Sequence, residues 1–97
     1  MNKNRRKQLS VLNDQLRALM GQMEDLKGEL ETIKDDEQEY RDNMPESLQD
    51  SEKANIADEA ISNSESAIDE LDNAINDLDN VINAVDNAIS NIEDAQA

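Results

Sequence analysis

The sequence predicts an all-α fold, an antiparallel helical hairpin of the coiled-coil type, and we expect two copies to pair into a four-helix bundle. Three observations lead to this prediction. Two stretches repeat apolar side chains at alternating spacings of three and four, the seven-residue (a to g) pattern of packed helices. A single proline, Pro45, separates them. The stretches have similar lengths, and a short connection between matched helices favours an antiparallel pair.

Residues 9–44 form the first predicted helix, which follows a basic N-terminal tail at 1–8. Apolar residues occupy its a positions (Leu9, Leu16, Met23 and Leu30) and its d positions (Leu12, Leu19, Leu26, Ile33 and Tyr40). We expect both rows to lie in the seam between the helices. Glu37 interrupts the a row. Gly21 and Gly28 fall at the outermost f position, where each lowers helix propensity by up to about 1 kcal/mol and leaves the seam intact.

Residues 45–53 form the predicted bend. A proline disfavours α-helical geometry in the residue before it, so the first helix should end at or before Met44. Proline also suits the first turn of a helix, and we expect one short turn over residues 45–49. Ser51 is the expected N-cap of the second helix.

Residues 54–96 form the second predicted helix, in which the seven-residue repeat is clearer. Isoleucine fills the a positions (Ile61, Ile68, Ile75, Ile82 and Ile89), and Ser64, Leu71, Leu78, Val85 and Ile92 fill d. Small residues fill g (Ala60, Ala67, Ala74, Val81 and Ala88). Three apolar positions per repeat make a face wider than one seam needs, so we predict self-association through this a/d/g face as a homodimer. The e positions, which include Asp72, Asp79 and Asp86, are expected to face solvent.

A register in which paired residue numbers sum to roughly 100 lets the two helices fill space together. Large Tyr40 and Met44 then meet the small alanines near residue 57, as packed layers require. The same register brings Glu37 near Ser64, so the polar interruptions of the two seams coincide. The seam residues that we expect to hold the single domain together are Leu16, Leu30, Ile68, Ile75 and Ile82.

The composition excludes several kinds of site. The chain has no Cys and no His, which removes disulfides, thiol chemistry, zinc–thiolate sites and Ser-His-Asp triads. No glycine-rich phosphate loop occurs, and the acidic run 69–72 lacks the glycine of a calcium loop and lies in mid-helix. We therefore expect no catalytic residue, no cofactor, no metal site and no enzymatic activity.

Charge and hydropathy limit the partners. The net charge of −15 repels nucleic acid and anionic membrane, and one tyrosine offers almost no surface on which bases could stack. No apolar run approaches the roughly 18 residues that a membrane span requires, and the basic start lacks the apolar segment of a signal peptide. We expect a cytoplasmic protein that binds neither nucleic acid nor membrane directly.

The acidic surface is the one feature large enough to carry a function. From residue 54 onward there are 11 acidic side chains and no basic ones. A charge of −15 along about 60 Å of helix is one per about 4 Å, against one per about 1.7 Å in duplex DNA, and a side-by-side dimer would reach about one per 2 Å. Two interpretations stay open: partial mimicry of nucleic acid, or simple solvation of a long bundle.

Two groups of acidic residues are candidates for partner binding. On the second helix they are Asp69, Glu70, Asp72, Asp77, Asp79 and Asp86, and beside the bend they are Glu39, Asp42 and Glu46. The basic residues Lys3, Arg5, Arg6 and Lys7 could contact nucleic acid. Neutralisation of Glu93 and Asp94 beside them is the simpler interpretation.

Residues 36–52, DEQEYRDNMPESLQDSE, resemble the core of a family of small, acidic, uncharacterised bacteriophage and prophage proteins, a core similar to DEEQE-x-x-DN-x-PESLQ-x-SE. The similarity covers about a fifth of the chain, and the family has no settled activity to transfer. It implies a phage-encoded protein inside a bacterial host cell, a setting that includes inhibitors of host nucleases and of CRISPR effectors.

The leading functional hypothesis is a non-enzymatic inhibitor, of the anti-CRISPR or anti-restriction type, that occupies the basic surface of a host nucleic-acid-binding protein. The alternative is a phage scaffold or chaperone that uses its apolar a/d/g face.

Overall fold

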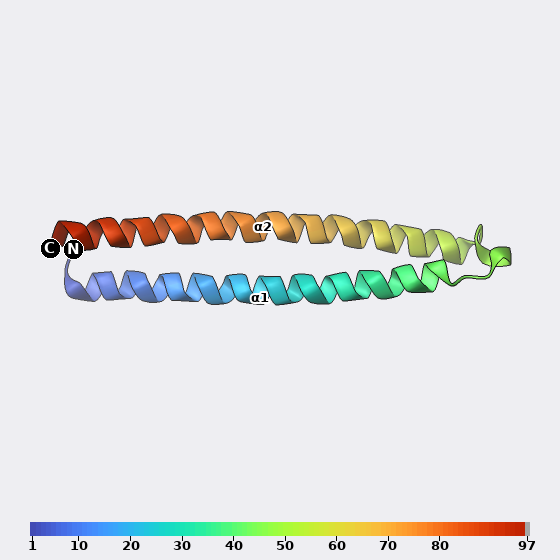
Figure 1. Ribbon diagram of the computed structural model, residues 1–97, viewed down its shortest axis with the longest axis horizontal. Helices are drawn as coiled ribbons and strands as arrows, with labels where there is room; N and C mark the ends of the chain where they lie inside the picture. Colours follow the sequence, from blue (N-terminus) through green and yellow to red (C-terminus); the bar gives the residue numbers. More distant parts are fainter. Residues whose placement is uncertain (97) are drawn as a thin grey trace. The chain divides into compact units, whose positions relative to one another are not determined.

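The computed structural model describes residues 1–96, which consist almost entirely of two helices (Figure 1). Helix α1 spans Lys3–Asp42, the 3-10 turn η1 spans Glu46–Leu48, and helix α2 spans Glu52–Gln96. No strand occurs within this described part of the chain. The all-α prediction is therefore confirmed.

Helix α1 begins earlier than the apolar repeat indicated. The side-chain Oδ1 of Asn2 accepts a hydrogen bond from the backbone N–H of Arg5 at 2.9 Å, so Asn2 is the N-cap. The basic residues from Lys3 onward belong to the first turns of α1, and the prediction of a separate tail at 1–8 is wrong. The apolar repeat starts only at Leu9, so it does not indicate where α1 begins. The capping residue Asn2 was the sequence signal for that start.

The bend follows its sequence signals closely. Helix α1 ends at Asp42, before Pro45, and η1 closes with a hydrogen bond from the Leu48 N–H to the Pro45 carbonyl at 2.8 Å. The Oγ of Ser51 accepts a hydrogen bond from the Ala54 N–H at 3.2 Å, which confirms Ser51 as the N-cap of α2. The bend thus covers residues 43–51, two residues earlier than predicted, and α2 begins at Glu52.

The chain forms two compact units, where the sequence predicted a single domain. Unit 1 combines Met1–Glu24 with Asn73–Ala97, and unit 2 is the continuous segment Asp25–Asp72. In each unit a segment of α1 pairs antiparallel with a segment of α2 (Figure 1). Residues in a helix pair contact only partners at their own level, so the packing stays local along the seam.

Polar contacts between the helices fix the same register inside each unit. In unit 1, Asn13 donates from Nδ2 to Asp86 Oδ1 at 2.5 Å. In unit 2, Lys27 Nζ lies 2.6 Å from Asp72 Oδ1, and Arg41 Nε lies 2.9 Å from Asp58 Oδ1. Each pair of residue numbers sums to 99, which confirms the predicted register of roughly 100.

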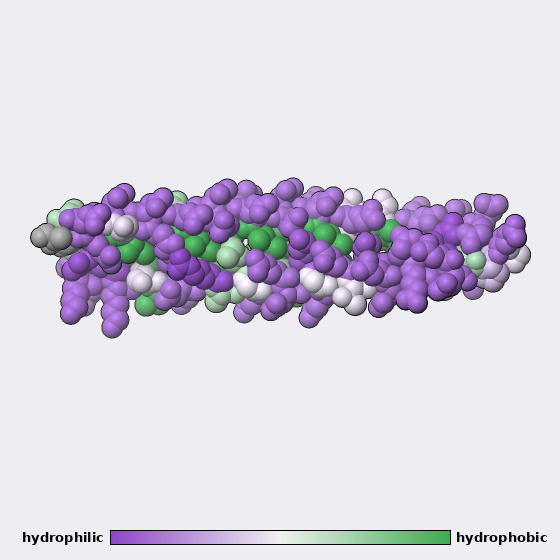
Figure 2. Space-filling model, viewed as in Figure 1, coloured by the Kyte–Doolittle hydropathy of each residue, from purple (hydrophilic) through white to green (hydrophobic). Residues whose placement is uncertain are grey.

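The buried core is small in both units. Ile75 and Ile82 are buried in unit 1, and Met44, Ala54, Ala57 and Ile61 are buried in unit 2. The predicted seam residues Leu16, Leu30 and Ile68 are half-buried. Met44 and the alanines of α2 are buried together, as the pairing of large with small residues predicted. In Figure 2 hydrophobic side chains gather between the helices, and hydrophilic ones cover most of the visible face.

The d row of α1 does not lie in the seam. Its residues are 47–62% exposed: Leu12, Leu19, Leu26, Ile33 and Tyr40. Helix α1 instead turns its a and e positions toward α2, because the e row holds the polar residues that pair with α2 acids, such as Asn13, Lys27 and Arg41. The prediction that the d row is buried, Tyr40 included, is wrong for this reason.

Helix α2 uses its a and d rows against α1, which leaves less free surface than predicted. Ile75 and Ile82 lie beneath α1, so the a row is not available to a second copy. Of the g row, Ala67, Val81 and Ala88 are exposed. Of the predicted a/d/g face of α2, only part of the g row is therefore free to contact a second copy.

Candidate partner-binding surface

The six acidic candidates of α2 divide into two structural groups. Asp69 and Glu70 in unit 2 and Asp77 and Asp79 in unit 1 are exposed. Asp72 and Asp86 instead contact α1. Asp72 is nevertheless exposed, as predicted for an e position, whereas Asp86 is half-buried, so the prediction that it faces solvent is wrong. Asp79 stays exposed because the register places Met20, which carries no charge, opposite it.

Asp86 joins the two helices of unit 1. Its Oδ1 accepts the 2.5 Å hydrogen bond from Asn13, and its Oδ2 pairs with the guanidinium of Arg17. Asn13 is only 2% exposed, and its own Oδ1 has no hydrogen-bond partner. A buried, half-satisfied amide costs stability but resists a shift of the helices along each other, as polar seam residues do in coiled coils. Asp86 therefore has a structural role in setting the register.

Ion pairs serve the same purpose in unit 2. Lys27 pairs with Asp72 of α2 at 2.6 Å and approaches Glu31 of its own helix at 3.8 Å. The carboxylates of these pairs are about half exposed, so each pair contributes at most about 1 kcal/mol. Because the basic side chains of unit 2 are few and largely engaged in such pairs, most acidic side chains of the unit have no basic partner.

Lys34 is held by its neighbour Asp35, whose carboxylate lies 3.0 Å from Nζ. The hydrogen bond and the charge of Asp35 raise the pKa of Lys34 above 10.5, with smaller contributions from the charges of Glu65 and Glu31. The ammonium group of Lys34 is thus charged at every physiological pH.

Arg41 organises the bend. Its guanidinium donates to Asp58 through Nε, to Gln49 Oε1 through Nη1, and to the Gln49 carbonyl through Nη2 at 3.2 Å. Gln49 in turn donates from Nε2 to the carbonyl of Met44 at 2.7 Å. One side chain therefore connects the end of α1, the turn and the start of α2, which explains structurally why arginine and glutamine occupy these positions.

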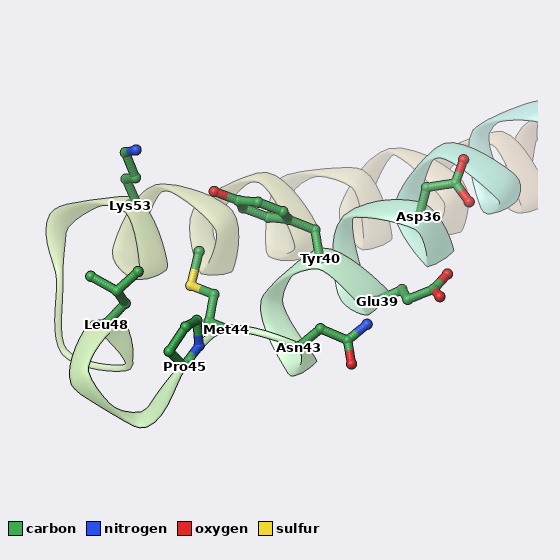
Figure 3. A pocket seen from close by; sticks show the side chains of 8 residues that line it. All are labelled: Asp36, Glu39, Tyr40, Asn43, Met44, Pro45, Leu48 and Lys53. Atoms are coloured by element: carbon green, nitrogen blue, oxygen red, sulfur yellow. The ribbon is translucent and has the colours of Figure 1, made fainter.

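A surface hollow of about 450 Å³ lies beside this bend (Figure 3). Tyr40, Met44, Pro45 and Leu48 give it an apolar lining, and Lys53, Asp36, Glu39 and Asn43 complete the lining. Tyr40 and Leu48 are 51% and 42% exposed. The hollow offers an apolar contact within an acidic surround.

The predicted bend residues Glu39, Asp42 and Glu46 are all exposed in unit 2. Glu39 lines the hollow, and Asp42 accepts a hydrogen bond from Gln38 Nε2 at 2.9 Å. With Asp69 and Glu70 they form the part of the predicted site that lies within one unit. We call these five residues the unit 2 acidic surface.

The two units differ sharply in charge. Unit 1 holds five basic and seven acidic side chains, a net charge of −2, whereas unit 2 holds four basic and 17 acidic, a net charge of −13. The longer helical segment in unit 2, residues 52–72, is about 31 Å long, so this unit carries roughly one net charge per 2.4 Å. That density is much closer to duplex DNA than the average over the whole chain.

Reasoning from the sequence missed the residues that hold the helices in register. The e row of α1 contains Lys27, Lys34 and Arg41, and the e row of α2 contains Asp58 and other acids. Opposite charges at the same heptad position of two antiparallel helices were a signal for these pairs. By contrast, no ion pair joins the basic start of α1 to Glu93 or Asp94 in the described residues, although the register sets Arg6 opposite Glu93.

The described residues contain no cluster of three or more side chains placed to hold a metal ion. Over the same part of the chain, neither helix has a stretch long and apolar enough to cross a membrane. No family model, curated protein or solved structure matches the chain.

Proposed function

We propose that the protein is a non-enzymatic acidic binding protein, and that unit 2 occupies a basic surface on a partner protein. The net charge of −13 on unit 2 carries this proposal. Three of its four basic side chains, Lys27, Lys34 and Arg41, already pair with acids of the same chain. A field of this sign attracts basic proteins and accelerates their association.

The partner that fits this charge is a nucleic-acid-binding protein. A basic surface that normally follows a phosphate backbone meets about one negative charge per 1.7 Å in duplex DNA, and unit 2 presents roughly one per 2.4 Å. The similarity of residues 36–52 to phage proteins favours a host defence protein as this partner, inside a bacterial cell. The mechanism is steric and electrostatic occupation of the nucleic-acid site.

A matched set of variants tests which unit makes the contact. The protein is immobilised, proteins are captured from bacterial lysate and identified, and each purified candidate is titrated by isothermal calorimetry. Asp69→Asn with Glu70→Gln removes two exposed charges from unit 2, and Asp77→Asn with Asp79→Asn removes two from unit 1. We expect about 10-fold weaker binding for the unit 2 pair and less than about 3-fold for the unit 1 pair, because charge–charge attraction is screened beyond about 8 Å.

Salt and competitor DNA test the mechanism. Raising salt from 0.05 to 0.5 M should weaken binding at least 10-fold and should raise the melting temperature of the unbound protein, because salt screens both the attraction and the self-repulsion of unit 2. Duplex DNA should compete for the partner. A partner whose binding ignores both salt and DNA would rule out electrostatic occupation.

A second candidate function, a scaffold or chaperone in phage assembly, is favoured by the exposed d row of α1. An apolar contact of this kind should hold or strengthen as salt rises. Capture of capsid or tail proteins with that salt dependence would support it over the electrostatic proposal.

We also propose that the protein acts as a homodimer in which two hairpins form a four-helix bundle. The small core and the exposed apolar rows support this, because thin helical pairs of this size bury little surface alone.

A further inference from the structure

The d row of α1 continues through both units, but its surroundings change. In unit 1, Leu12 and Leu19 have uncharged neighbours at the flanking c and g positions, which are Gln8, Val11, Gln15, Ala18 and Gln22. In unit 2, Leu26 and Ile33 have three acids at the equivalent positions, which are Asp25, Glu29 and Asp36. The same apolar row is thus accessible to a like-charged molecule only in unit 1.

Helix α2 adds to this surface in unit 1. The ion-paired e rows occupy one margin of the seam, so heptad geometry places the d row of α1 and the g row of α2 at the other margin. Leu19 and Val81 are each 47% exposed, and the register sets them at the same level. A hollow of about 670 Å³ lined by Val11, Leu12 and polar neighbours extends the surface toward the start of α1. We call Val11, Leu12, Leu19 and Val81 the unit 1 apolar face.

We infer that the unit 1 apolar face docks the same face of a second copy of this chain, with α1 of each copy against α2 of the other. Charge argues for this occupant. The α1 segment of unit 1 holds five basic and two acidic side chains, net +3, and its α2 segment holds five acidic and no basic ones, net −5. Crossed pairing between copies therefore brings opposite charges together. This inference rests on the proposed dimer and assigns its contact.

A charge at Ile75 would not test the dimer. Ile75, in the a row of α2, is buried beneath α1, so a charge there would disrupt the hairpin rather than the dimer. Leu12→Gln with Leu19→Gln removes the exposed apolar contact, adds no charge and keeps good helix formers. The matched control is Leu26→Gln with Ile33→Gln, the same row in unit 2, where the exposed fractions are similar.

Sedimentation equilibrium across a range of concentrations gives the dissociation constant of each variant, and circular dichroism checks that helix content is retained. We expect the unit 1 pair to raise the dissociation constant at least about 100-fold, because four leucines lose their apolar burial in each dimer. The unit 2 pair should change it less than about 3-fold. Equal effects of the two pairs, or no effect of the unit 1 pair, would overturn the assignment.

A cross-linking measurement keeps the test independent of variant stability. The chain has no cysteine, so single thiols can be placed on the two helices that face each other between copies. Copies with Gln15→Cys, on the apolar side of α1, are mixed with copies with Val81→Cys on α2. The control mixture replaces Gln15→Cys by Asp14→Cys, on the outer side of α1. Mild oxidation should form the mixed disulfide in the first mixture and little of it in the control. A protein that binds its basic partner but stays monomeric overturns this inference and the proposed dimer, and leaves the proposed binding function intact. One that dimerises through unit 1 without binding a basic protein overturns only the proposed binding function.

Discussion

Unit 1 and unit 2 are built on the same seam and the same register, yet they present very different surfaces. Their buried cores each rest on α2 isoleucines, Ile82 in unit 1 and Ile61 in unit 2. Their net charges are −2 and −13. Part of the difference arises beside the d row of α1, where the g positions hold glutamine in unit 1 and acids such as Glu29 and Asp36 in unit 2. The rest comes from acids at other exposed positions of unit 2 and in the bend. A heptad repeat can therefore keep the same packing along a helix pair while the residues outside the seam give the two units different surfaces.

Among the changes that test this comparison, matched truncations of one core side chain in each unit should have the largest effect on the free energy of unfolding. Ile82→Ala in unit 1 and Ile61→Ala in unit 2 each remove a side chain that is less than 10% exposed, and each should lower the free energy of unfolding by about 2–3 kcal/mol. Ile56→Ala, at a residue 58% exposed, is the control and should cost less than about 0.5 kcal/mol.

Hydrogen exchange on these variants shows whether the units open separately. If they do, Ile82→Ala should speed exchange chiefly in residues 1–24 and 73–96, and Ile61→Ala chiefly in residues 25–72. Uniform acceleration along the whole chain by both variants would mean that the two units unfold as one.

Two glycines offer a smaller and opposite effect. Gly21 in unit 1 and Gly28 in unit 2 are helical, and a Cβ added to either would meet no atom within 4 Å. Alanine at either position should raise the free energy of unfolding by about 0.5–1 kcal/mol, because it restricts the unfolded chain and favours the helix. Urea denaturation measures both. A gain at one glycine and a loss at the other would reveal a contact in one unit that the seam geometry does not explain.

The smallest effect concerns pH. The pKa of Lys34 is raised in the folded protein, so its contribution to stability is complete below the unfolded value of 10.5 and is lost as pH rises through the folded value. NMR titration of the lysine side chains should place Lys34 above 10.5. Asp35→Asn should lower its midpoint, and an unchanged midpoint in that variant would show that Asp35 is not the cause.

The sequence predicted most of the fold because heptad spacing, a proline and a capping serine are local signals. The register also followed from matching large Met44 with the small residues Ala54 and Ala57. The face of α1 that meets α2 did not follow. The apolar pattern favours the a and d rows, because the e row of α1 holds only one apolar residue, Met20, yet α1 turns its a and e rows toward α2. The charged residues of the e row, such as Lys27 and Arg41, bring the e row into the seam. Their ion pairs form only with the acids of α2, so the sequence of α1 alone does not reveal them.

The candidate site was predicted in part. Exposed acids such as Asp69 and Glu70 lie where solvation alone would put them. Asp72 and Asp86 contact α1 because Lys27 and Asn13 lie opposite them. The sequence of α2 alone does not indicate these partners. The concentration of charge in unit 2 depends on which segments fold together. The charge density averaged over the whole chain does not reveal it.

The bend braced by Arg41 has a kinetic consequence. Its contacts close short loops, 8 residues from Arg41 to Gln49 and 17 to Asp58, whereas the Asn13–Asp86 contact of unit 1 closes 73. Closing the longest of these loops in an unfolded chain costs about 1 kcal/mol more entropy than closing the 17-residue loop. Folding should therefore start at the bend and proceed toward the chain ends, so that the acidic unit is structured before the ends of the chain pair.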